Sequence, residues 1–195
     1  MSAPSRDAVL ALVEARVANE NTRRHMLATE AIMRALASRL GEDPDVWGLA
    51  GLGHDLDVEG TESDFSRHGS EAADALRAAG LPEAAAHAVE AHNPATGVAA
   101  ESSLDVGLIA ADQLSGLVTA AALIRPDKLL AEVKPKSVRK RYREGAFARG
   151  VDRASIARCG EFGLELDEFL ELGLVAMQGV SADALRGRGR RRRPA

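Results

Sequence analysis

The sequence predicts an all-α protein, a compact helical bundle with a C-terminal helical extension. Aromatic residues make up only 3% of the 195 residues, and alanine, a strong helix former, recurs throughout the chain. No run of β-branched residues alternates with polar residues at the period of two that a half-buried strand needs. The hydrophobic share of 46% and the charged share of 28% are typical of a globular protein with a sizeable core.

Capping residues and helix breakers divide the chain into a succession of helices. Pro44 and Pro82 suit the first turn of a helix, and Gly41 and Gly80 suit the position just after its end. Asn21 is predicted to cap the second helix. We expect helices over residues 7–17, 21–41, 44–55, 68–79, 82–91, 105–124, 134–144, 153–160 and 166–180, with a short helical turn starting at Pro126 and polar loops at 57–66 and 96–103.

Charge and composition predict three segments. We expect residues 1–125 to form one helical domain and 126–185 to pack on it as an extension, followed by a disordered Arg-rich tail at 186–195. The tail holds six of the 25 Lys and Arg residues and no acid. The remaining 19 bases face 29 acids, so the rest of the chain carries a net charge of −10. Such an acidic body is not typical of a nucleic-acid-binding domain, and contact with RNA through the tail is kept as an alternative.

The sequence shows no export or membrane signal. The first residues, MSAPSRDAVLALVEAR, lack a basic stretch followed by an apolar one, and no uncharged apolar run approaches the roughly 20 residues of a membrane helix. The single cysteine, Cys159, excludes an internal disulfide and a cysteine-built zinc site. We therefore expect a cytoplasmic protein with no membrane span.

Polar residues interrupt the apolar helix faces at a few positions. His25 shares a helix face with Ile32 and Leu36, the pair His54-Asp55 closes an apolar helix, and Asp112 lies one turn after Leu108. Each also has a structural explanation: a core histidine bonded to a carbonyl, a simple helix end, and a salt bridge to a buried arginine. Imidazole and carboxylate groups together are ligands for Mn, Fe, Zn or Mg, and these four can hold one ion while leaving positions for water and substrate.

The order of these residues resembles the HD-domain metal-dependent phosphohydrolases of the bacterial HDIG-like type. The resemblance covers about residues 20–125 and lies in the following segments: Arg24-His25-Met26, WGLAGLGHDLD (47–57), FSRHGSEAADALRAAG (65–80), AVEAHN (88–93) and LIAADQLSG (108–116). It implies an HD-domain-like helical bundle. It also implies that His25, His54, Asp55 and Asp112 are metal ligands and that His54 and Asp55 are the catalytic pair.

The resemblance also bears on the number of ions. Relatives with two metals add two histidines between the HD pair and the last aspartate, and His68 and His92 match those positions. Six donors are too many for one ion that also binds water and substrate, so two ions bridged by Asp55 are expected. A single ion, with His68 and His92 binding phosphate or supporting the ligands, is the alternative.

The implied function is hydrolysis of a phosphate ester or phosphoanhydride, with a nucleotide as one plausible substrate. Many relatives carry a lysine three residues after the aspartate of the HD pair, where this chain has Val58. That difference leaves open a catalytically silent protein that binds metal or a ligand for regulation. The basic stretch is therefore the candidate source of cations for the substrate phosphate, at Lys134, Lys136, Arg139 and Lys140. The alternative interpretation of these residues is a solvated helix face.

Three further acids lie close to the predicted ligands. Glu71 follows His68 by one helical turn and is a candidate to orient it. Asp57 and Glu59 follow the HD pair and are weaker candidates for a general acid or base. His87 lies five residues before His92, on a different face of its helix, and is expected to be a surface or packing residue.

Overall fold

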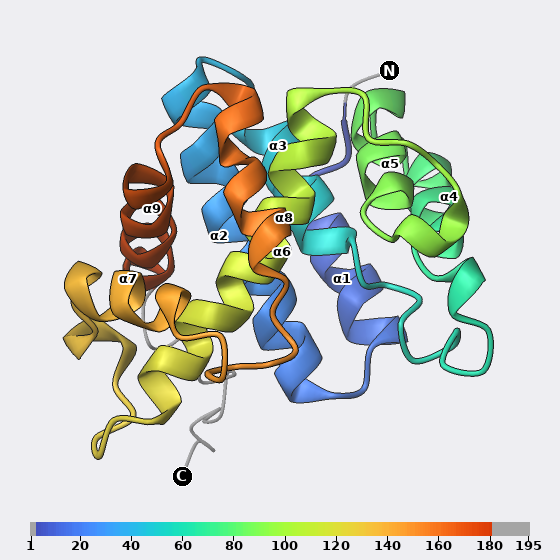
Figure 1. Ribbon diagram of the computed structural model, residues 1–195. Coiled ribbons are helices and arrows are strands. Elements are labelled where there is room, and N and C mark those ends of the chain that lie inside the picture. The colour runs from blue at the N-terminus through green and yellow to red at the C-terminus, as the bar shows by residue number, and fades with distance from the viewer. Residues whose placement is uncertain (1–2, 181–195) are drawn as a thin grey trace, which may run out of the picture.

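Nine α-helices and four short 3-10 helices make up the described part of the chain, residues 3–180 of the computed structural model, which holds no strand (Figure 1). The all-α prediction is confirmed. The helices are α1 (Arg6–Arg16), α2 (Glu20–Leu40), α3 (Pro44–Gly53), α4 (Ser70–Ala78), α5 (Glu83–Ala91), α6 (Ser103–Leu123), α7 (Pro135–Arg143), α8 (Arg153–Ala157) and α9 (Leu166–Gly179). The 3-10 helices are η1 (Phe65–Arg67), η2 (Pro94–Thr96), η3 (Leu130–Glu132) and η4 (Arg158–Phe162).

Two helix starts differ from the prediction because a neighbouring residue makes the better cap. Asn19, and not Asn21, caps α2, and its Oδ1 accepts the N–H of Asn21 at 2.8 Å. Helix α6 starts two residues before the predicted Asp105, because Ser102 and Asp105 form a reciprocal capping box. A serine followed three residues later by an acid was the signal in the sequence.

Two expected segments are also displaced. The helix predicted from His68 begins at Ser70, because Gly69 adopts a φ of 94°, which ends η1 and redirects the chain before α4. His68 therefore lies in the extended connection between the two helices. The short helical turn expected at Pro126 is absent there, and the 3-10 helix η3 forms a few residues later.

Helices α2, α3 and α6 form the centre of the bundle. Helix α3 packs along α2, and α6 lies against both of them and against α5. Helices α4 and α5 pair on one side of this centre, and α9 covers α2 and α6 on the other (Figure 1). The segment after residue 125 thus packs on the central helices through α7, α8 and α9.

Helix α6 is the central helix of the bundle. Its length of 21 residues and mean hydropathy of 1.5 over an 18-residue window meet the criteria for crossing a membrane by length and composition, but 61% of that window is buried inside the protein. Both of its aspartates, Asp105 and Asp112, face other helices and have partners there. Its apolar character is explained by packing against α2, α5 and α8.

The C-terminal residues 181–195 lie outside the part of the chain that the structure describes. The predictions of a disordered Arg-rich tail at 186–195 and of RNA contact through it fall on these residues.

Candidate metal centre

Six side chains meet where the central helices face the α4–α5 pair. His25 comes from the second turn of α2 and Asp112 from the middle of α6, whereas the other members stand after helix ends. His54 directly follows α3, with Asp55 next to it, and His92 directly follows α5. His68 follows η1. The group is therefore assembled from five separate segments of the chain.

A glycine on α3 allows this helix to pack closely against α2. A Cβ atom on Gly51 would lie 3.0 Å from the backbone nitrogen of Glu30 and from the carbonyl oxygen of Thr29, so α3 can approach the backbone of α2 only with glycine there. His54, at the end of α3, then reaches His25 on α2. Their Nε2 atoms lie 3.2 Å apart.

The first donor group consists of His25, His54 and Asp55, whose ligand atoms all lie within 4.8 Å of one another. Asp55 places one carboxylate oxygen 3.3 Å from His54 Nε2 and the other 3.6 Å from His25 Nε2. Asp112 closes the same side, with Oδ1 2.9 Å from His25 Nε2 and 3.9 Å from His54 Nε2. The structure thus brings together the four residues of the H…HD…D pattern.

The second donor group consists of Asp55, His68 and His92, again within 4.8 Å of one another. The Nε2 atoms of His68 and His92 lie 3.2 Å apart. They lie 3.5 Å and 3.7 Å from Asp55 Oδ1. Asp55 is the member that the two groups share.

Backbone carbonyls fix two of the four imidazole rings. His54 Nδ1 donates to the carbonyl of Gly51 at 2.9 Å, and His92 Nδ1 donates to the carbonyl of Val89 at 2.5 Å. A carbonyl oxygen only accepts, so each ring carries a proton on Nδ1. In a neutral ring the lone pair is then on Nε2, which faces the cluster.

Side chains fix the other two rings in the same way. Asp57 Oδ1 accepts from His68 Nδ1 at 2.8 Å. Ser115 Oγ lies 2.8 Å from His25 Nδ1 and donates its own proton to the carbonyl of Asp112 at 2.8 Å. The serine oxygen must therefore accept from His25 Nδ1. All four imidazoles thus bond outward through Nδ1 and present Nε2 to the cluster, as metal-ligating histidines do.

This arrangement fits divalent metal ions. When both rings of a pair are neutral, two Nε2 lone pairs face each other at 3.2 Å and repel, and a shared cation makes the contact favourable. Nitrogen ligands at about 2.0–2.1 Å from one ion lie about this far apart. The donor set of imidazoles and carboxylates suits Mn, Fe or Zn.

The electrostatics of the cluster also favour cations. Burial opposes the charged form of Asp55, but the surrounding histidines, His54 first, outweigh it and hold its pKa well below the ordinary value. Burial likewise opposes the charged form of Asp112, and the hydrogen bond from His25 reverses that effect and lowers the pKa. Both carboxylates therefore stay negative at neutral pH.

The pKa values of the histidines differ with the balance between burial and contact with carboxylates. Complete burial lowers the pKa of His54 to about 4, so its ring is neutral at pH 7. Burial also works to lower the pKa of His25 and His92, but the nearby carboxylates raise both above the ordinary value, Asp112 at 2.9 Å from His25 and Asp55 at 3.7 Å from His92. A proton on either ring takes the place of a cation when no ion is bound, and metal binding displaces it.

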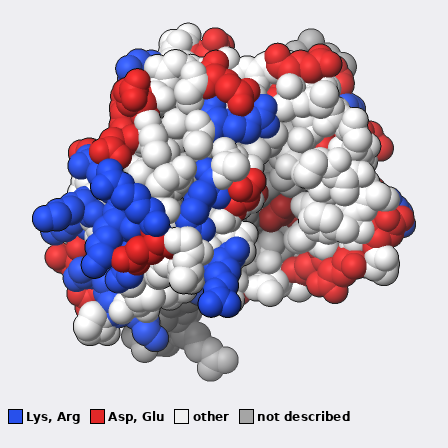
Figure 2. All heavy atoms as spheres, viewed as in Figure 1, with Lys and Arg blue, Asp and Glu red and all other residues white. Residues whose placement is uncertain are grey.

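The cluster is open to solvent on one side. The side chains of Asp55 and Asp112 keep 13% and 21% of their exposure, and Figure 2 shows a recess on this face with acidic atoms at its floor. Phe65, 55% exposed, stacks on His68 with ring centroids 4.8 Å apart and an interplanar angle of 29°. A solvent-facing aromatic ring therefore borders the second donor group.

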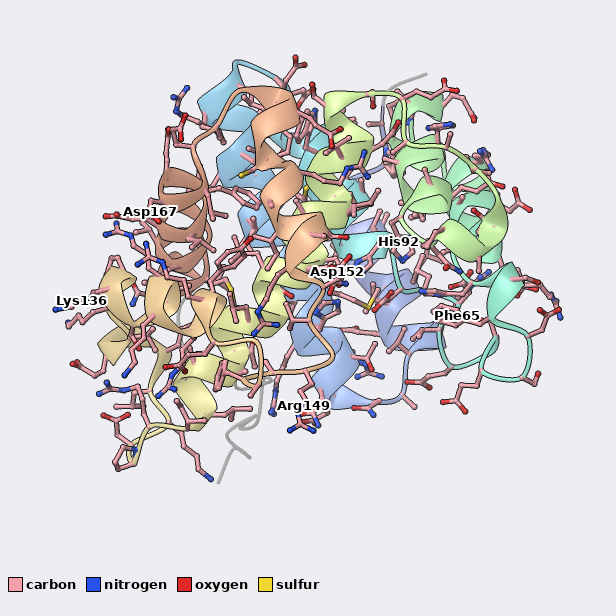
Figure 3. The ribbon with its side chains drawn as sticks, in the orientation of Figure 1. Phe65, His92, Lys136, Arg149, Asp152 and Asp167 are labelled. Atoms are coloured by element: carbon pink, nitrogen blue, oxygen red, sulfur yellow. The ribbon has the colours of Figure 1, made fainter. Side chains whose placement is uncertain are left out.

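The structure does not bring the basic stretch to this cluster. Arg139 pairs with Asp167 and Glu171 across α7 and α9, and Lys134 and Lys140 lie near Glu132 and Glu144. Lys136 points outward at the edge of the molecule, away from His92 (Figure 3). The basic atoms form a surface patch over α7 in Figure 2. These contacts match the alternative of a solvated helix face.

The acids near the ligands have roles that the sequence did not show. Glu71, which was expected to orient His68, pairs with Arg67 instead. Asp57, expected as a general acid or base, accepts the hydrogen bond from His68 Nδ1 and orients that ring. Asp57 also accepts the N–H groups of Gly69 and Ala72 at 2.9 and 2.8 Å, which fixes the start of α4.

Further polar residues form contacts around the cluster that the sequence did not predict, and His87 lies outside it. Glu59 accepts the N–H groups of Ala18 and Asn19 ahead of α2. The amide of Asn93 donates to the carbonyls of Phe65 and His68 at 2.7 and 2.8 Å, which holds η1 beside the cluster. His87 is outside the cluster, 3.2 Å from Asp105. Ser115 was not predicted as a supporting residue. Its only signal in the sequence is its position three residues after Asp112.

The fold and the cluster define a class of helical protein with a histidine- and aspartate-built metal centre. The comparison with protein families agrees, because the family model of the HD domain matches residues 22–117, so this part of the chain is an HD domain. HD domains bind divalent metals, and the family consists generally of hydrolases. Neither the curated proteins nor the solved structures gave a match to the chain.

Proposed function

We propose that the protein is a metal-dependent phosphohydrolase that cleaves a phosphate ester or phosphoanhydride of a small molecule. The observation that carries the proposal is the pair of donor groups that share Asp55, with four imidazole Nε2 atoms facing inward. Membership of the HD family supports the reaction class.

In this proposal the first donor group, with Asp112, holds one ion, and the second holds another. Asp55 would be a ligand common to both, since its carboxylate oxygens lie 3.3–3.7 Å from Nε2 atoms of both groups. The first group then supplies two histidines and two carboxylates, and the second supplies two histidines and one carboxylate. Neither set fills the coordination sphere of an octahedral ion, so positions remain for water and the substrate phosphate.

Bound divalent ions lower the pKa of a coordinated water and polarise a phosphoryl oxygen. The chain contributes the placement of the ligands. Asp55 keeps its negative charge, and His54 stays neutral and fully buried beside it. Both residues would act as ligands of the ions next to the reacting atoms.

The substrate we propose is an anionic phosphorylated molecule with a planar apolar part, such as a nucleotide. The phosphate would bind at the open side of the cluster. The exposed ring of Phe65, which stacks on His68, would offer a surface on which the planar part of the substrate could stack. No lysine follows the HD pair, since Val58 stands there, so the metal ions carry most of the phosphate binding.

The test is a screen of phosphorylated metabolites with Mn, Mg, Fe and Zn, run in parallel with the Asp55→Ala variant. We expect turnover with at least one ion, loss of turnover on adding a chelator, and recovery on restoring the metal. The variant should be inactive with the same substrate. A wild-type protein that binds metal but turns over no phosphorylated compound would instead favour the silent, regulatory alternative that Val58 leaves open.

A further inference from the structure

The two oxygens of the Asp112 carboxylate have different partners. Oδ1 faces the cluster, 2.9 Å from His25 Nε2. Oδ2 faces away and accepts a hydrogen bond from the side-chain amide of Gln113 at 2.7 Å. Gln113 therefore determines which oxygen of Asp112 is turned toward the metal site, and how the carboxylate plane is oriented.

Gln113 is itself held by a residue from beyond the HD domain. Its Oε1 accepts the backbone N–H of Asp152 at 2.8 Å. That bond settles the orientation of the amide, because the oxygen is engaged by a donor and the nitrogen is left for the carboxylate. Asp152 is the N-cap of α8, and its Oδ1 accepts the N–H of Ala154 at 2.9 Å.

The loop that ends at Asp152 is shaped from inside by Arg153. The guanidinium donates to backbone carbonyls along the turn between α7 and α8, namely those of Tyr142, Glu144, Phe147, Ala148 and Val151. Within the loop, Ala148 adopts a φ of 45°, a conformation that non-glycine residues rarely take. Such a backbone persists only where surrounding contacts hold it. Here the carbonyl of Ala148 accepts from the N–H of Val151 at 2.9 Å and from Arg153 at 3.4 Å.

These contacts form one continuous chain from the extension to the metal site. Arg153 shapes the loop, the loop places the N–H of Asp152, that N–H orients Gln113, and Gln113 orients Asp112. The family match ends at residue 117, so the loop, Asp152 and Arg153 lie outside the HD domain. They belong to the extension, in which the sequence analysis placed only the basic stretch at the site.

We propose that Gln113 is a positioning residue through which the extension sets the metal affinity of the first donor group. This inference rests on the proposed metal centre. Partners of metal ligands typically change affinity by about 10–100-fold when they are removed. We therefore expect Gln113→Met, which keeps the side-chain size and removes both hydrogen bonds, to weaken Mn²⁺ binding at the first group by about that factor.

The experiment titrates Mn²⁺ into metal-free, full-length protein and follows the spectrum of the bound ion by electron paramagnetic resonance. The matched control is Gln178→Met on α9, because Gln178 also bonds to the backbone of the extension, where its amide donates to the carbonyls of Leu130 and Val133 at 3.0 Å. The control should keep the wild-type affinity and spectrum, whereas Gln113→Met should change both.

A second variant tests the chain of contacts itself. Arg153→Met should release the loop and weaken Mn²⁺ binding, and combining it with Gln113→Met should add little further loss, because both act along one path. Should Gln113→Met fail to fold, Gln113→Asn gives the same test, since the shorter amide cannot span Asp112 and Asp152.

The outcomes separate this inference from the proposed function. If Gln113→Met or Gln113→Asn binds Mn²⁺ within twofold of the wild type, with an unchanged spectrum, the positioning role is wrong and the phosphohydrolase proposal stands. Fully additive losses in the double variant would overturn the path through Arg153. A wild-type protein that binds none of Mn²⁺, Fe²⁺, Zn²⁺ or Mg²⁺ would overturn the metal centre and this role with it.

Discussion

The two donor groups that share Asp55 are built on different parts of the fold. The side chains of His25, in the first group, and of the adjoining Asp112 come from within α2 and α6, the two 21-residue helices of the core. In the second group, His68 and His92 stand just after η1 and the nine-residue helix α5. The first group is therefore fixed by long helix packing and the second by local caps and by the side chains of Asp57 and Asn93.

The two groups also differ in charge. The first has Asp112 in addition to the shared Asp55, whereas the second has two imidazoles and the shared carboxylate only. A more anionic, more rigid ligand set binds a divalent ion more tightly. In the proposed two-ion centre, the first site would therefore retain its ion and the second would exchange it more readily.

The largest expected effect comes from the residue common to both groups. Asp55→Ala should remove metal from both sites and weaken Mn²⁺ binding by more than about 100-fold, beyond the range seen for outer partners of ligands. Elemental analysis of wild type and variant, purified without chelator, measures it. Equal metal content in the two proteins would contradict the shared role of Asp55.

The next effect separates the groups by stoichiometry. We expect two ions per chain in the wild type and one in His68→Ala and in His92→Ala, with the remaining ion bound as tightly as the stronger wild-type ion. Metal analysis across added Mn and Fe measures it. One ion per chain in the wild type, unchanged in both variants, would leave only the single-metal alternative.

A smaller effect is expected from the partner of His68. Asp57→Ala leaves His68 Nδ1 and the N–H groups of Gly69 and Ala72 without their acceptor. We expect the second site to weaken by about tenfold and the free energy of unfolding to fall by about 1–3 kcal/mol. Urea denaturation and Mn²⁺ titration measure the two changes, and an equal weakening of both sites would argue against the division into groups.

The smallest effect is expected far from both groups. Arg139→Ala removes partly exposed ion pairs to Asp167 and Glu171, each worth about 0.2–1 kcal/mol. Metal affinity and the KM for any substrate found should stay as in the wild type. A tenfold rise in KM would return the basic face of α7 to the substrate site.

The sequence was sufficient to predict features that single residues mark. The helices, their approximate ends and the all-α class follow from proline, glycine and capping residues, and the HD resemblance follows from the order of histidines and aspartates. A buried charged position such as Asp112 also stands out, since a carboxylate on an apolar face needs a partner.

What the sequence could not show were contacts between distant segments. Ser115 meets His25 across 90 residues, and the N–H of Asp152 meets Gln113 across 39. Neither residue type is unusual where it stands, so no local pattern marks it. The basic stretch is the reverse case. Its run of cations is visible in the sequence, but tertiary packing sets which way the helix face that carries them points.

Because the ligands come from five segments of the chain, no short stretch of it can bind the ions as the folded protein does. Metal supply and folding are then thermodynamically linked: an ion that binds only the native state, present at 100 times its dissociation constant, adds about 2.7 kcal/mol to stability. The population of folded protein in a cell would thus follow the concentration of free metal. Depletion of the ion would lower the amount of intact protein as well as its activity.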